Sequence, residues 1–166
     1  MRHTKSNWTL AVVLGAGIIL SACGDASNEV PPSPDSYLYV WQFDEDANDD
    51  PNFLSVINAD PSSLGYGSLV TTVPTTGVRG GAHHTSLVLP TSSFLFANDY
   101  RGNGSFIFDT RNTAAPTLKA TFQNKGEYNY AHTFSELANG NILAVFQTQG
   151  TDDPRPGGLV ELTTDG

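Results

Sequence analysis

Two stretches of this sequence share the pattern that decides its fold: His84-Thr85-Ser86-Leu87 followed by Phe94-Leu95-Phe96-Ala97, and His132-Thr133-Phe134-Ser135 followed by Ile142-Leu143-Ala144-Val145. The two His-Thr pairs are 48 residues apart, and so are the apolar runs that follow them. A repeat of about 40–50 residues built from short strands is typical of β-propellers, in which each repeat forms one blade. The sequence therefore predicts an all-β propeller in which repeat-equivalent residues of neighbouring blades lie close together.

Alternating apolar and polar residues, rich in aromatic and β-branched types, mark the strands. The predicted strands are 37–42, 53–58, 68–73, 85–89, 94–98, 105–110, 118–123, 133–137, 142–147 and 158–163. Turn dipeptides separate many of them: Pro61-Ser62, Asn103-Gly104, Asn139-Gly140 and Pro156-Gly157. Asn-Gly pairs favour tight turns because both residues tolerate positive φ. No window shows a helical period, which strengthens the all-β prediction.

The number of repeats indicates a partial propeller. Residues 36–166 provide enough chain for two to three blades, whereas propellers close with four to eight. The last repeat stops at Asp165-Gly166, where a further strand is expected. We therefore expect 36–166 to be a partial β-propeller domain, truncated at its C-terminus. The alternative is a small β-sandwich that folds alone.

The N-terminal segment has the features of a secretion signal. Arg2 and Lys5 precede an apolar run from Leu10 to Leu20, which is shorter than the roughly 20 residues needed to span a bilayer. Leu20-Ser21-Ala22-Cys23 resembles a bacterial lipoprotein signal box, in which the cysteine is lipidated. We expect 1–22 to be a signal peptide, Cys23 to carry a membrane-anchoring lipid, and 23–35 to be a flexible tether. The domain would then lie outside the cytoplasm, anchored to a bacterial membrane at the outer membrane or the periplasmic face.

The charge of the chain argues against nucleic acid as a partner. After Cys23 there are six Lys and Arg residues against all 17 Asp and Glu, so this part carries a formal charge of −11. Such a surface repels phosphate backbones. The acidic stretch 44–50 superficially resembles a calcium loop, but Asp49 stands where the glycine is required and Ser55 where the bidentate Glu is required. We expect it to be a solvated hairpin tip.

Three histidines follow the signal segment: His83, His84 and His132. His83 and His84 are adjacent, and the 48-residue spacing makes His84 and His132 repeat-equivalent. Adjacent residues on a regular strand point to opposite faces, so both side chains of the pair face the propeller axis only if the chain bends there, as Gly80 and Gly81 would permit. Neutral imidazole is a common ligand of copper, zinc and iron. In the absence of cysteine thiolates, the set favours copper or iron over structural zinc. The alternative is that the histidines only bond to the backbone at the entry to each blade.

Several segments resemble the selenium-binding protein family, which includes the methanethiol oxidases. They are 53–63 with Tyr66-Gly67-Ser68, the His83-His84 pair, His132-Thr133, 137–143 and 156–162, in the family's order, and the resemblance covers about 37–166. It implies a seven-bladed propeller of which this chain is the N-terminal part. It also implies a copper centre held by His83, His84 and His132, in enzymes that oxidise methanethiol to formaldehyde, hydrogen sulfide and hydrogen peroxide.

Two functions follow as hypotheses. The first is a lipid-anchored, copper-dependent oxidase of small thiols, which requires at least three histidines to converge on one point. The second is a non-catalytic propeller lipoprotein that binds a ligand or a protein partner, because propellers host both roles. No nucleotide or phosphate-binding motif and no paired nucleophile and base are present.

Overall fold

The computed structural model describes residues 36–43, 50–78, 80–150 and 155–166. The predicted signal peptide (1–22), the lipidation site at Cys23, the tether (23–35) and the acidic segment 44–49 lie outside these residues. The regular secondary structure in the described ranges consists of strands alone, which confirms the all-β prediction. No helix with the length and hydropathy of a bilayer span occurs in this described part of the chain.

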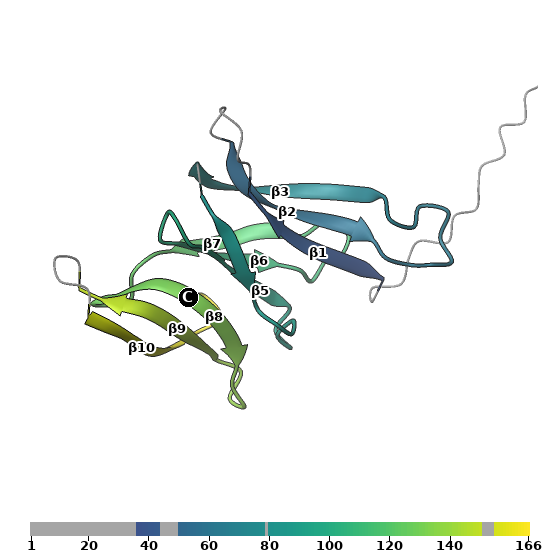
Figure 1. Ribbon diagram of the computed structural model, residues 1–166. Coiled ribbons are helices and arrows are strands. Elements are labelled where there is room, and N and C mark those ends of the chain that lie inside the picture. Colours follow the sequence, from purple (N-terminus) through teal and green to yellow (C-terminus); the bar gives the residue numbers. More distant parts are fainter. Residues whose placement is uncertain (1–35, 44–49, 79, 151–154) are drawn as a thin grey trace, which may run out of the picture.

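In the described residues, ten strands form three antiparallel sheets that follow one another in chain order (Figure 1). The first sheet has the order β1-β2-β3, the second β4-β5-β6-β7 and the third β10-β9-β8. The strand bounds are β1 Tyr37–Gln42, β2 Pro51–Asn58, β3 Leu69–Val78, β4 Ala82–Thr85, β5 Phe94–Asp99, β6 Gly104–Asp109, β7 Thr117–Phe122, β8 Tyr128–Glu136, β9 Ile142–Gln149 and β10 Arg155–Leu162.

The second sheet is buried on both faces because it lies between the other two. Alternate residues of β5 point to opposite sides, as strand geometry requires. Leu95 and Ala97 join a core cluster with Leu54 and Trp41 of the first sheet. Phe96, by contrast, belongs to the core cluster that includes most of the buried residues of the third sheet. This two-sided burial explains why β5 is a nearly continuous apolar run.

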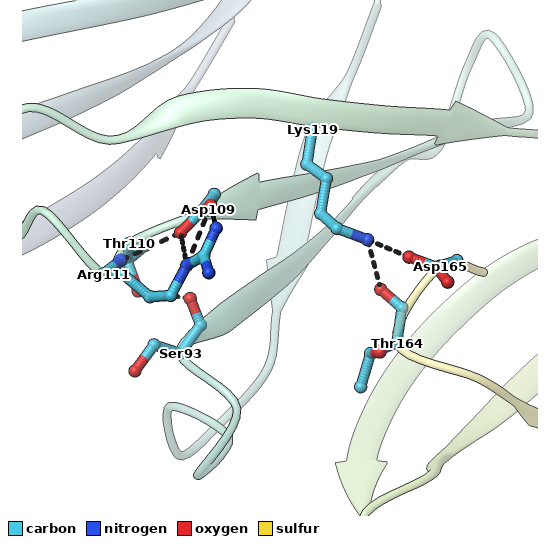
Figure 2. Close-up of polar contacts among 7 residues, drawn as sticks. All are labelled: Ser93, Asp109, Thr110, Arg111, Lys119, Thr164 and Asp165. Carbon is cyan, nitrogen blue, oxygen red and sulfur yellow. Dashed lines mark hydrogen bonds and ion pairs between the residues drawn. The ribbon is translucent and has the colours of Figure 1, made fainter.

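Polar contacts lie at the end of β6 and on the edge strand β7 of the second sheet (Figure 2). Arg111 forms an ion pair with Asp109, and its Nε lies 2.9 and 3.0 Å from the two carboxylate oxygens. The Thr110 hydroxyl donates to the Ser93 carbonyl at 2.8 Å. Lys119 on β7 reaches past its own sheet: it pairs with Asp165 and donates to the Thr164 carbonyl at 3.1 Å. The chain after β10 is thereby tied to the second sheet.

Two sequence predictions are wrong. The strand predicted at 85–89 lies at 82–85 instead, and Leu87 is 93 % exposed in the loop that follows. The chain leaves the ladder after Ser86, whose N–H makes its last bond to the Phe96 carbonyl, and Pro90 then precludes a further ladder donor. The predicted Pro156-Gly157 turn is also wrong, because both residues lie in β10 and Pro156 pairs with Thr148 on β9.

The role of Gly157 is close approach. A Cβ there would lie 1.7 Å from the Phe146 carbonyl oxygen on β9, so only glycine fits. Two other predicted turns are confirmed: Asn103 has a φ of 52° and Gly140 a φ of 83°.

Candidate metal centre

Each histidine lies where the first strand of a sheet shifts its register. In the second sheet, Ala82 pairs with Asp99 and Thr85 pairs with Ala97, so His83 and His84 both lie opposite Asn98. Two residues facing one define a β-bulge, which locally turns the strand and re-aims its side chains. The bend required for both histidines to face one way is therefore present at the pair itself.

The third sheet repeats the device. Ala131 pairs with Phe146 and Thr133 pairs with the next residue, Val145, so His132 is an extra residue between two consecutive partners. β4 and β5 both contact β8, which brings the two bulges together. The histidine-bearing segments of neighbouring sheets thus meet where both β4 and β8 depart from regular pairing.

The register agrees with the predicted equivalence of His84 with His132. The first residue paired after each bulge is Thr85, opposite Ala97, and Thr133, opposite Val145, and the two members of this pairing are both separated by 48 residues between the sheets. The residues just before them, His84 and His132, therefore occupy equivalent positions. His83 adds a further imidazole beside this equivalent pair.

The three imidazoles form one compact group, which we call the histidine cluster. The ring centroids lie 4.0 Å apart for His83–His84, 4.4 Å for His84–His132 and 4.9 Å for His83–His132. One ligand nitrogen from each residue lies within 4.8 Å of the others. His83 and His84 are exposed and His132 is partly buried, so the cluster is open to solvent on one side. The structure thus brings together all three predicted site residues.

Local electrostatics favour uncharged rings. Burial lowers the pKa of His132, and the nearby His84 and His83 lower it further. Burial, followed by the charge of His83, lowers the pKa of His84. Neutral imidazole is the form that binds metals. The Nδ1 atom of His132 lies 3.1 Å from the Thr133 hydroxyl, which leaves Nε2 as its available ligand atom.

The donor set fits a transition-metal ion. Metal–nitrogen bonds of about 2.0–2.1 Å in a tetrahedral arrangement place ligand nitrogens about 3.3 Å apart. The separations in the histidine cluster are within about 1.5 Å of that value, which side-chain rotation can supply. Among the described residues this is the one group of three His, Cys, Asp or Glu side chains close enough to share an ion.

Two neighbours of the cluster were not predicted. The ring of Tyr100 lies 5.3 Å from that of His83. Asn98 lies opposite the bulge of β4 and is fully buried. Neither carries a sequence signal: a polar residue at the end of an apolar run resembles the start of an ordinary turn.

Comparison with known proteins supports the predicted resemblance. No family model matches the chain. Over 157 residues it is 29 % identical to a methanethiol oxidase from Hyphomicrobium sp, an alignment that covers 89 % of this chain and 36 % of that protein. The X-ray structure of a hypothetical selenium-binding protein from Sulfolobus tokodaii superposes with a TM-score of 0.65 and 19 % identity, over 80 % of this chain and 35 % of that one.

The chain thus spans about a third of the length of each of these proteins. The predicted similarity to selenium-binding proteins and methanethiol oxidases is confirmed in sequence by the first comparison. The second shows a shared fold.

Proposed function

We propose that this chain is part of a lipid-anchored, extracytoplasmic β-propeller protein that binds copper through His83, His84 and His132 and oxidises small thiols. The observation that carries the proposal is the convergence of three imidazoles from two neighbouring sheets at matched bulges. The similarity to a methanethiol oxidase supports a related oxidase chemistry.

A propeller is supported by how the sheets stack. Each three- or four-stranded antiparallel sheet packs face to face on the next, and the first strand of a sheet contacts the first strand of the sheet before it. This relation holds for β4 with β1 and again for β8 with β4. A repeated step of this kind, with the first strands brought together, is how blades are arranged around an axis. Seven blades and the lipid on Cys23 remain part of the proposal.

Copper suits the donors better than the alternatives. Among divalent first-row metals, nitrogen-rich sites bind Cu²⁺ most tightly, and structural zinc sites normally include thiolates. The described residues offer no thiolate, because the single cysteine of the sequence is Cys23. A bound copper ion would supply one-electron redox chemistry and an open position for a thiolate.

The protein's own part is to present and orient the imidazoles. The two bulges set the positions of the imidazoles, the lowered pKa values of His84 and His132 favour the unprotonated rings, and the contact of Thr133 with Nδ1 of His132 leaves Nε2 available as a ligand. The exposure of His83 and His84 gives a small substrate access from solvent. For methanethiol the balanced reaction consumes one O₂ and one H₂O and yields formaldehyde, hydrogen sulfide and hydrogen peroxide.

The test is elemental analysis of the gene's whole product, prepared without residues 1–23. We expect about one copper per chain, lost in the His84→Ala/His132→Ala double variant and retained in Leu64→Ala, a change at an exposed loop residue. Peroxide and sulfide would then form from methanethiol only with the copper-loaded protein. If no copper binds after loading, the oxidase proposal fails, and the non-catalytic binding role remains.

A further inference from the structure

We propose that Asn98 is a positioning residue of the histidine cluster: its side-chain amide fixes the distance between the strand that bears His84 and the strand that bears His132. The inference concerns the geometry of the cluster, and its meaning for catalysis rests on the proposed function. Asn98 lies on β5, opposite the β4 bulge, and its side chain is 0 % exposed.

The amide bridges two sheets with both of its ends. Its Oδ1 accepts the backbone N–H of His84 at 2.6 Å, and its Nδ2 donates to the backbone carbonyl of Ala131 at 2.9 Å. Ala131 is the residue before His132. Since an N–H must meet the oxygen and a carbonyl must meet the nitrogen, the orientation of the amide is settled by its partners. One rigid group of three heavy atoms thus links the backbone of His84 to that of Ala131.

The first sheet is also attached at Asn98. The indole N–H of Trp41 on β1 donates to the Asn98 carbonyl at 2.8 Å. Trp41 also packs on Phe106, with ring centroids 5.4 Å apart. Asn98 is therefore held from the first sheet while it holds the third, which limits how far the linked strands can drift.

A β-bulge does not require this amide. In the third sheet the position opposite the bulge is occupied by Val145, which has no side-chain donor or acceptor, and the bulge forms there nonetheless. What distinguishes Asn98 is its hydrogen bond to the backbone of β8, at Ala131. Buried polar groups are costly unless both ends are bonded, so an amide at this place is expected only where two fixed partners face it. Here those partners are the backbone of a histidine and that of a histidine's neighbour.

The first experiment measures geometry without any metal. Nuclear Overhauser contacts between the imidazole protons of His84 and His132 are recorded in wild type, Asn98→Leu and Asn98→Asp. We expect the contact in wild type, its loss in Asn98→Leu, which removes both bonds, and a weakened contact in Asn98→Asp, which keeps the acceptor for His84. The control is Val56→Ala, a cavity at a fully buried residue of β2, which should lower stability but preserve the contact.

The second experiment separates positioning from general loosening, with copper as the probe in a double-mutant cycle. Asn98→Leu should weaken copper binding at least tenfold in the wild-type background. In the His132→Ala background its effect should fall below about threefold, because the bond to Ala131 then positions no ligand. Asn98→Asp, measured in the same two backgrounds, gives the same comparison if Asn98→Leu fails to fold.

An unchanged imidazole contact in both Asn98 variants would overturn the proposal, as would an equal loss of copper affinity in both backgrounds. If the wild-type protein binds no copper, the proposed function fails on its own, and the imidazole contact still decides the role of Asn98.

Discussion

The packing between the second and third sheets gives a sharp prediction at Phe134. This residue is two positions after His132 on β8 and is 1 % exposed. Its ring lies 5.5 Å from that of Phe96 and 6.5 Å from that of Phe122, both from the second sheet. Truncation to alanine removes a buried aromatic ring and leaves a cavity between the two sheets. Neither sheet can move to fill this cavity without disturbing its other contacts.

We therefore expect Phe134→Ala to lower the free energy of unfolding by about 3–5 kcal/mol, the range for buried Phe-to-Ala changes. Against a total stability of about 5–15 kcal/mol, this cost is between about a fifth and the whole of the total. Phe134→Leu, which keeps most of the volume, should cost less than about 1.5 kcal/mol. Urea denaturation followed by circular dichroism measures both, and the m-value checks that unfolding stays two-state. A cost below about 1 kcal/mol for Phe134→Ala would refute the packing of these sheets against each other.

Three further predictions test separate features. Gly157→Ala should lower the midpoint of thermal unfolding markedly, because its Cβ would meet the Phe146 carbonyl, whereas alanine at Gly65, whose Cβ would meet only side-chain atoms at 3.3 Å, should have a smaller effect. Hydrogen bonds from Arg111 hold the pKa of Asp109 at about 2, below its usual 3.8, so its contribution to stability is present above pH 3.8 and is lost as the pH falls through about 2. Acid titration should show a smaller loss in this window for Asp109→Asn, and identical curves would contradict the pair. Copper, once bound, should be retained to a lower pH than a site of ordinary imidazoles with pKa 6.5 permits, because protons compete less for the two rings whose pKa is lowered; release already complete at pH 6.5 would contradict this.

Local sequence signals predicted most of the strands because a strand with a buried face needs apolar residues on that face, and this requirement is visible in the sequence. β5 and β9 are apolar runs bounded by turn residues, and they stay strands because the two faces of β5 and one face of β9 are buried. The turn at Gly140 was equally readable, since positive φ is a property of the residue itself.

The features that were missed depend on contacts between sheets. A bulge loses one backbone hydrogen bond between the strands and is stabilised by groups far away in the chain. The residues His83-His84 alone therefore do not predict it. The strand position of Pro156 was missed as well. Pro156 lies in β10 and pairs with Thr148 on β9, although a Pro-Gly dipeptide normally indicates a turn. The convergence of the histidines was predicted from the repeat, whereas the bulge that places both His83 and His84 opposite Asn98 is visible only in the register.

Metal binding and sheet packing should be coupled, because the ligands come from two sheets. An ion that binds only the folded state stabilises it by RT ln(1 + [L]/Kd), or about 2.7 kcal/mol at a hundredfold excess over Kd. That exceeds the expected cost of Phe134→Leu and falls short of the cost of Phe134→Ala. At this copper concentration the leucine variant should reach at least the stability of the metal-free wild type, while the alanine variant should stay below it. If both variants recovered fully, the cavity would be smaller than the burial of Phe134 implies. If neither gained stability, the histidine cluster would not be joining the two sheets through an ion.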